Sequence, residues 1–228
     1  MRRFAVLFLL ALSFTIFAQS GSYDFATSGL TQGGFKFGVG ATSIRPEGEK
    51  VTIEGYTPQI SGRFGFFFTI NFVEYVAIEP GLAFGLKHGT ADYMENTISP
   101  WPPRFEDATM LITHLEFPLL FKFMYNLEDA GIQPVMFIGP VFNYNVYHHF
   151  SYDLYEDDDY YNANEIKDVQ GFDMSLATGI GSEFAVGKGR MILNFRYDIG
   201  MSSVVHGNED YEVLTDVFTA EIGYAFRR

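Results

Sequence analysis

The charged residues of this chain follow a period of two along eight strand-like stretches, and this pattern constrains the fold more than any other feature. In residues 191–201, for example, Arg196 and Asp198 alternate with apolar residues such as Phe195. Successive side chains of a strand point to opposite faces, so each stretch has one apolar face and one charged face. A single charged residue, Asp216, breaks the rule. The eight stretches are residues 33–43, 59–70, 75–87, 109–125, 135–147, 171–186, 191–201 and 214–226.

The charged face carries a nearly balanced set of five basic and six acidic side chains, together with one histidine. Ten glycines share this face, and their small size leaves room for long side chains in a narrow space. We therefore predict that the charges point into the lumen of a closed barrel, while Phe, Leu and Ile point outward. The predicted lumen residues are Lys36, Arg63, Glu79, Lys87, His114, Glu116, Lys122, Asp173, Glu183, Arg196, Asp198 and Glu221.

The first twenty residues are typical of a targeting segment. Arg2 and Arg3 precede an apolar run at residues 4–12, and cleavage is expected after Ala18 or after Ser20. The apolar run is shorter than the roughly 20 residues of a spanning helix, although an uncleaved anchor is the alternative. We expect a signal peptide at 1–18, a short mature N-terminal segment at 19–32 and a barrel at 33–228.

Composition narrows the class of protein further. The formal net charge of −13 becomes −15 without the two signal arginines, which argues against nucleic acid as a partner. The absence of cysteine excludes a disulfide framework and lipid attachment through a thiol. Hydrophobic residues make up 47% of the chain, yet no apolar run after the signal approaches the length of a spanning helix. Outer-membrane barrels distribute their apolar residues by alternation in this way.

The connections between the stretches alternate in length. Residues 71–74, 126–133 and 187–190 are short, whereas 45–58, 88–108, 148–170 and 202–213 are longer. Outer-membrane barrels have short periplasmic turns and longer external loops, so all four longer connections are expected outside. The sequence thus predicts an all-β fold, an eight-stranded antiparallel up-and-down transmembrane β-barrel of the cell outer membrane. Residues expected at the membrane interfaces are Tyr125, Tyr144, Tyr197 and Tyr224.

Five segments resemble the PorT-like, porin-family outer-membrane β-barrel proteins of Bacteroidetes and related bacteria. They are LEFPLLFKF at 115–123, FIGP at 137–140, FDM at 172–174, GIGSE at 179–183 and FRYDIGM at 195–201. The resemblance covers nearly the whole mature chain and implies the barrel fold. It says less about activity, since most members have no defined biochemical role, although the namesake is tied to protein secretion.

The lumen charges allow two interpretations. Eight strands enclose a space just wide enough for side chains to fill, so charges inside it must pair. Aligning strand ends places Arg196 beside Glu221, and Glu79 beside Lys122. The favoured interpretation is a salt-bridged plug, and the alternative is a gated polar path.

Two histidine motifs are the candidates for metal ligands. His114 and Glu116 share the inward face but lack further ligands at suitable spacing, and His148 and His149 lie on opposite strand faces. No metal and no cofactor is therefore predicted.

The third external loop is strongly acidic and rich in tyrosine. Carboxylates can bind calcium, but no glycine stands at the sixth position from Asp153 or Asp157, so the helix–loop–helix calcium spacing is absent. A solvated, self-repelling loop tip is the simpler interpretation, with an external protein or a cation as the alternative partner. The acidic residues of this loop are Asp153, Glu156, Asp157, Asp158 and Asp159.

Catalytic motifs are weak. Ser202 and His206 lie close together near the external rim, which is the most that the sequence offers toward a lipid-modifying barrel enzyme. Trp101, flanked by prolines, forms a stiff aromatic segment in the second loop, for which loop packing is the simpler explanation.

The predicted function is therefore non-enzymatic: a plugged barrel with acidic external loops and a structural or interaction role, linked to secretion or envelope integrity. A narrow porin-like channel for small solutes is the alternative. A lipid-modifying enzyme and a soluble lipocalin-like barrel, which would place the phenylalanines inside, are further alternatives. Outer-membrane lipid is the expected surrounding, and the oligomeric state is not predicted.

Overall fold

The protein is almost entirely β-strand in the residues that the computed structural model describes, which are 32–47, 51–96, 104–125, 132–156, 159–164, 170–204 and 212–226. The expected signal peptide and the segment up to residue 31 lie outside them and stay predictions. The strands are β1 (Gln32–Glu47), β2 (Val51–Val73), β3 (Val76–Asn96), β4 (Arg104–Met124), β5 (Ile132–Glu156), β6 (Asp159–Asn164), β7 (Phe172–Val186), β8 (Gly189–Gly200) and β9 (Glu212–Phe226).

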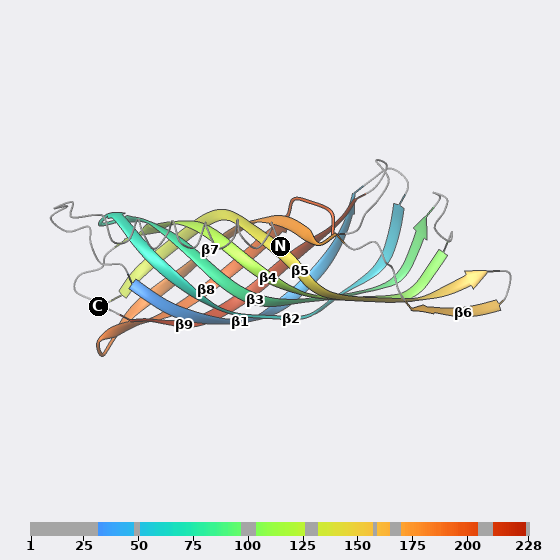
Figure 1. Ribbon diagram of the computed structural model, residues 1–228, viewed down its shortest axis with the longest axis horizontal. Coiled ribbons are helices and arrows are strands. Elements are labelled where there is room, and N and C mark those ends of the chain that lie inside the picture. The colour runs from blue at the N-terminus through green and yellow to red at the C-terminus, as the bar shows by residue number, and fades with distance from the viewer. Residues whose placement is uncertain are drawn as a thin grey trace, which may run out of the picture.

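Eight of these strands form one closed antiparallel barrel (Figure 1). The sheet runs in the order β4-β3-β2-β1-β9-β8-β7-β5, and the pairing of β4 with β5 closes it. The ninth strand, β6, pairs with β5 beyond the barrel and extends the β5 end into a hairpin. The predicted eight-stranded antiparallel barrel is thus confirmed. Among the described residues, no helix has the length and hydropathy needed to cross a membrane.

Several strands are longer than predicted, and the predicted connections 45–58, 88–108 and 148–170 are wrong in this respect. β2 and β3 stay paired from Val51↔Asn96 inward, and β3 and β4 from Glu95↔Arg104. The sequence of these extensions lacks the apolar alternation that marks the eight predicted stretches. The sequence pattern therefore ends while backbone pairing continues.

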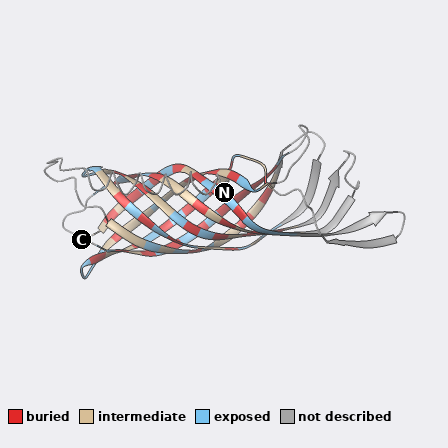
Figure 2. Ribbon diagram, in the orientation of Figure 1, coloured by how far each residue is buried: buried red, intermediate tan, exposed pale blue. Residues whose placement is uncertain are grey.

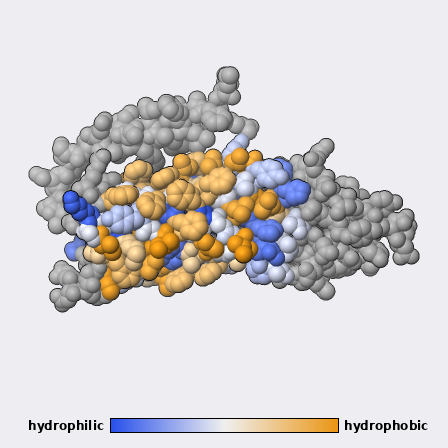
Figure 3. All heavy atoms as spheres, turned by 90° about the horizontal axis from the view of Figure 1, so that it is seen from below, coloured by the Kyte–Doolittle hydropathy of each residue, from blue (hydrophilic) through white to orange (hydrophobic). Residues whose placement is uncertain are grey.

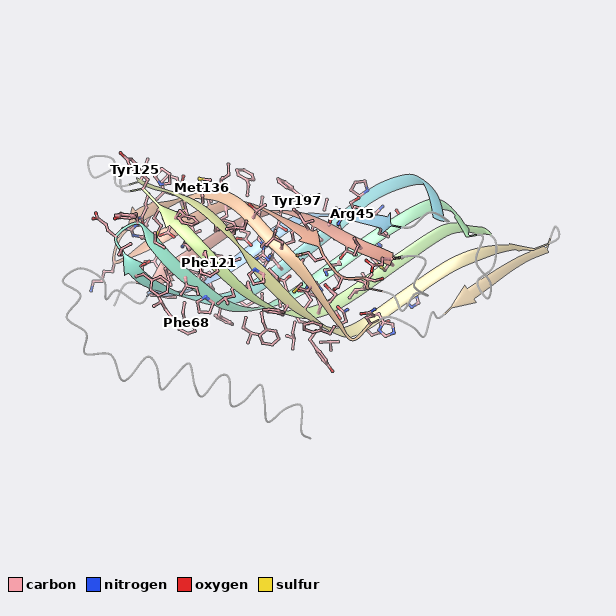
Figure 4. All side chains as sticks on the ribbon, turned by 90° about the horizontal axis from the view of Figure 1, so that it is seen from above. Arg45, Phe68, Phe121, Tyr125, Met136 and Tyr197 are labelled. Atoms are coloured by element: carbon pink, nitrogen blue, oxygen red, sulfur yellow. The ribbon has the colours of Figure 1, made fainter. Side chains whose placement is uncertain are left out.

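The wall of the barrel has the predicted polarity. Phe195 is 56% exposed, whereas its neighbour Arg196 is 2% exposed. Figure 2 shows the same alternation of buried and exposed residues along the barrel strands, and Figure 3 shows apolar residues over much of the barrel surface. The labelled Phe68, Phe121 and Met136 belong to this outer surface, on β2, β4 and β5 (Figure 4). This polarity excludes the lipocalin-like arrangement with phenylalanines inside.

Two inward glycines explain how so narrow a barrel closes. A Cβ atom at Gly40 would overlap the carbonyl oxygen of Phe218, and one at Gly139 would overlap that of Leu119. The neighbouring strand approaches each glycine too closely for any side chain. A separate requirement applies to Gly187, which adopts a φ of 59° in the turn between β7 and β8.

Candidate functional site: the charged lumen

Two arginines occupy the centre of the lumen among three carboxylates. Arg196 of β8 lies 2.7 Å from Asp198 and 3.8 Å from both Glu116 and Glu221. Arg63 of β2 contacts Glu116 and lies 3.4 Å from both Asp198 and Glu221. All five side chains are at most 9% exposed. This central cluster joins β2, β4, β8 and β9, so it ties opposite parts of the wall together.

A second group of ions lies toward the end with the short turns. Glu79 of β3 contacts Lys36 and lies 2.9 Å from the Nζ of Lys122. The same Nζ lies 2.7 Å from Glu183 of β7. Lys36 Nζ also lies 4.6 Å from the centroid of the Phe67 ring. One lysine thus bridges two carboxylates from different strands, which is how a buried ammonium group satisfies its donors.

A third group lies toward the end with the long hairpins. Lys87 donates to Asp173 at 3.0 Å, and Asn143 and Asn145 donate to the same carboxylate at 2.7 and 3.1 Å. Asp173 is 2% exposed, and its oxygens accept from three side chains on β3 and β5. The structure therefore places all twelve predicted lumen residues inside the barrel and brings them together in three groups along it.

Sequence reasoning missed Arg190. Its Nη1 lies 3.6 Å from Glu183, and it donates to Gln133. Arg190 has the same parity as Arg196, but it lies in the predicted connection 187–190, just before the predicted stretch 191–201. With Arg190 included, the described lumen holds six cations and six carboxylates. The amides Asn143, Asn145 and Asn194 also donate to lumen carboxylates, and a pattern of charge alone does not mark them in the sequence.

His114 takes part in the central cluster as a partner of Glu116. Its Nε2 lies 3.0 Å from Glu116 Oε1, and the ring is 2% exposed. The described residues contain no group of three or more His, Cys, Asp or Glu side chains that could hold a metal ion. His148 and His149 are exposed on the wall near the long hairpins.

The exceptional Asp216 belongs to a polar contact on the outer side of the wall. It lies 3.5 Å from Arg45, and its carboxylate accepts from the Tyr197 hydroxyl at 3.3 Å and from the Gly200 N–H at 3.0 Å. Arg45 also donates to the Gly200 carbonyl at 2.8 Å. Tyr197 and Arg45, both labelled in Figure 4, thus cover an outward charge near the end of the barrel that carries the long hairpins. Such a contact fits the headgroup level of a membrane.

The remaining sequence candidates are not assembled into a site. Ser202 Oγ accepts from the Met174 N–H at 2.7 Å, and Val213 donates its N–H to Ser203 at 3.0 Å. His206 and Trp101 lie outside the described residues. Of the acidic loop, Asp153, Glu156 and Asp159 belong to the β5–β6 hairpin, which is strand where a loop was predicted, whereas Asp157 and Asp158 lie outside the described residues.

Two small cavities lie on either side of the central cluster. The first, of about 20 Å³, is lined among others by Ser61, His114 and Asn143. The second, of about 30 Å³, is lined among others by Lys36 and Glu79. A cavity needs roughly 10–15 Å³ by this measure to hold one water molecule, so each has room for one or two. Arg63 and Glu116 line the first cavity, and Arg63 and Glu221 line the second. The ions of the central cluster therefore separate the two cavities.

An apolar outer wall around a lumen of paired ions defines a transmembrane β-barrel of the outer-membrane type. Residues 17–206 match the family described as outer membrane protein beta-barrel domain, and the chain belongs to this family. A protein of this family sits in membrane lipid, and the family indicates the outer membrane. No curated protein sequence matches the chain.

Several solved outer-membrane structures are similar to the chain at low sequence identity. OprG from Pseudomonas aeruginosa is 14% identical, with 87% of this chain and 97% of that chain covered and a TM-score of 0.46. Neisserial surface protein A is 13% identical, with 83% and 95% covered and a TM-score of 0.38. The outer membrane protease OmpT from Escherichia coli is 7% identical, with 92% and 100% covered and a TM-score of 0.47.

Proposed function

We propose that this protein is a non-enzymatic, plugged outer-membrane barrel that displays an acidic external surface to a partner. We infer the plug from the central cluster of Arg63 and Arg196 with Glu116, Asp198 and Glu221. Its ions come from four strands and separate two water-sized cavities. The five side chains are each at most 9% exposed, which supports a lumen closed to bulk solvent. Their ion pairs also link the four strands to one another.

The distribution of charge supports the display role. Residues 45–58, 88–108, 148–170 and 202–213 contain seventeen acidic and four basic residues, a net charge of −13, equal to that of the whole chain. The lumen is neutral, so nearly all the net charge belongs to the end that carries the long hairpins. A protein with a basic surface, or a cation, is the complementary partner. The resemblance to PorT-like proteins adds secretion or envelope integrity as the process served.

The absence of enzymatic activity is part of the proposal. The serine weighed as a nucleophile, Ser202, already accepts a backbone hydrogen bond from Met174. A nucleophilic serine needs an adjacent base, and the described residues place none beside it.

Single-channel recording tests the plug against the narrow channel. We expect the wild-type protein in a planar bilayer to give no steady current. The Arg63→Ser/Glu221→Ser double variant removes one cation and one anion, so the net charge of the lumen is unchanged while its centre is emptied. We expect this variant to conduct. Steady single-channel currents from the wild type would overturn the plug and favour the passive channel for small solutes.

A further inference from the structure

Three prolines interrupt three consecutive ladders of the barrel wall. Between β2 and β3 the pairs run to Phe67↔Gly81 and resume at Ile70↔Ile78. Between β3 and β4 they stop at Pro80↔Leu119 and resume at Ala83↔Glu116. Between β4 and β5 they stop at Pro118↔Val141 and resume at Phe121↔Ile138. The register is the same on both sides of each gap, so none of the three is a bulge.

One missing donor explains each gap. In an antiparallel ladder each N–H···O bond contributes to two neighbouring residue pairs. Because proline has no N–H, one proline can remove two pairs. The continued registers place the nitrogens of Pro80, Pro118 and Pro140 opposite Phe68, Gly81 and Leu119, respectively. Three carbonyl groups therefore lose their ladder donor.

These three positions form one line across the wall. Pro80 and Gly81 are consecutive on β3, and Pro118 and Leu119 are consecutive on β4. The missing bonds therefore follow each other from β2 to β5, four neighbouring strands of the barrel (Figure 1). The other five ladders of the barrel have no gap over the paired residues described.

Accessibility changes at the same line. Gly81 and Pro118 are partly accessible, although they face inward. Every other inward-facing position from residue 77 to 89 on β3 and from residue 110 to 124 on β4 is buried. The 30 Å³ cavity lies directly inside, because Gly65, Ala83 and Pro118 line it.

The line also lies within the apolar band. Phe66, Phe68, Leu82, Phe121 and Ile138 surround it on the outer face and are 44–57% exposed. An unpaired backbone carbonyl that faces hydrocarbon is unfavourable unless water or protein reaches it. With three ladder bonds missing in a row, fewer backbone hydrogen bonds hold the strands together here than elsewhere in the barrel wall.

We propose that the barrel wall opens locally along this proline line, between β2 and β5, and that the inner cavity is thereby reached sideways from the hydrocarbon phase. The ions of the central cluster lie between this cavity and the end with the long hairpins, and Lys36, Glu79, Lys122 and Glu183 are paired toward the other end. Apolar Ala83 and Leu120 line this cavity together with Lys36 and Glu79. The closed cavity has room for only one or two water molecules, so a small lipid-soluble molecule with a polar group is the class that enters when the wall is open.

Thiol labelling tests the opening, because the chain contains no cysteine. Ala83→Cys places a thiol in the cavity on β3, and Ala177→Cys places a matched thiol on β7 in an uninterrupted ladder; the alanines are 7% and 0% exposed. Each variant is reconstituted in liposomes and treated with N-phenylmaleimide, which partitions into lipid, or with a sulfonated maleimide in water. We expect the lipid-soluble reagent to label Ala83→Cys about tenfold faster than Ala177→Cys, as local opening predicts. The sulfonated reagent should label neither.

Equal rates for the two variants with N-phenylmaleimide would overturn the proposal, as would fast labelling of Ala83→Cys by the sulfonated reagent. Hydrogen exchange of the unmodified protein provides a test that does not depend on a cysteine variant. Amides of residues 79–83 and 117–121 should exchange about tenfold faster than those of residues 177–181 and 194–198. The Pro118→Ala variant restores one donor and should slow this exchange. Uniform exchange around the barrel, or no effect of the substitution, would contradict an opening at this line.

Discussion

Arg196→Met is expected to lower the free energy of unfolding by about 3–5 kcal/mol, because it removes one partner from a buried ionic cluster. Arg63 would then be the one arginine left beside Asp198, Glu116 and Glu221, at distances of 3.4 Å or less. A methionine fills most of the arginine volume, so the loss reports on charge rather than on a cavity. Urea titration of the protein in lipid vesicles, followed by tryptophan fluorescence or by electrophoretic mobility, measures it.

Arg190→Met is the matched control for this substitution. Its side chain is 28% exposed and its nearest carboxylate oxygen lies 3.6 Å away. Pairs of this kind contribute roughly 0–1 kcal/mol, so the stability should change little. Adding Asp198→Asn to Arg196→Met should recover part of the loss, because it removes one of the unpaired charges. Equal losses for Arg196→Met and Arg190→Met would show that the central cluster does not hold the barrel together.

The second large effect concerns the outer face. Phe195→Arg is expected to destabilise the protein by about 2–4 kcal/mol, the range for an arginine facing lipid near the middle of a bilayer. Phe195 is 56% exposed and lies in the middle of β8, where it stacks against Phe218 at 6.4 Å. In a water-soluble sheet an exposed phenylalanine would tolerate this change.

Phe72→Arg places the same substitution at a position nearer the membrane interface, for comparison with Phe195→Arg. Phe72 is 53% exposed but lies one residue from the end of β2, beside a short turn. Near an interface the same substitution is expected to change stability by about 0–1 kcal/mol. Unfolding of both variants in vesicles gives the two values. A difference between them requires a hydrocarbon environment, so similar values at the two depths would contradict the membrane assignment.

Much of the wall could be predicted from sequence because its pattern is local. Each residue of a strand points to the face opposite its neighbours, so the parity of Arg196 and Phe195 already assigns one to the lumen and the other to lipid. The same logic would have placed Arg190 in the lumen had the strand been started two residues earlier. The strand ends were less predictable, because the apolar pattern stops at the membrane while β2 to β5 continue beyond it.

Asp216 is a residue whose structural surroundings the local sequence pattern does not predict. Its parity points outward, which is unfavourable for a carboxylate in lipid. The structure covers it with Arg45, Tyr197 and the Gly200 amide, which come from β1 and β8. Partners on two other strands cannot be read from the residues around Asp216.

By itself, the sequence determined the fold class, the number of barrel strands, the inward direction of the charges and the need for those charges to pair. These follow from side-chain alternation and from the unfavourable burial of a lone ion, both of which act along a single strand. Tertiary structure alone decided which ions meet and that Pro80, Pro118 and Pro140 share one line. The reason is physical: heights on different strands depend on the register and tilt at which the barrel closes.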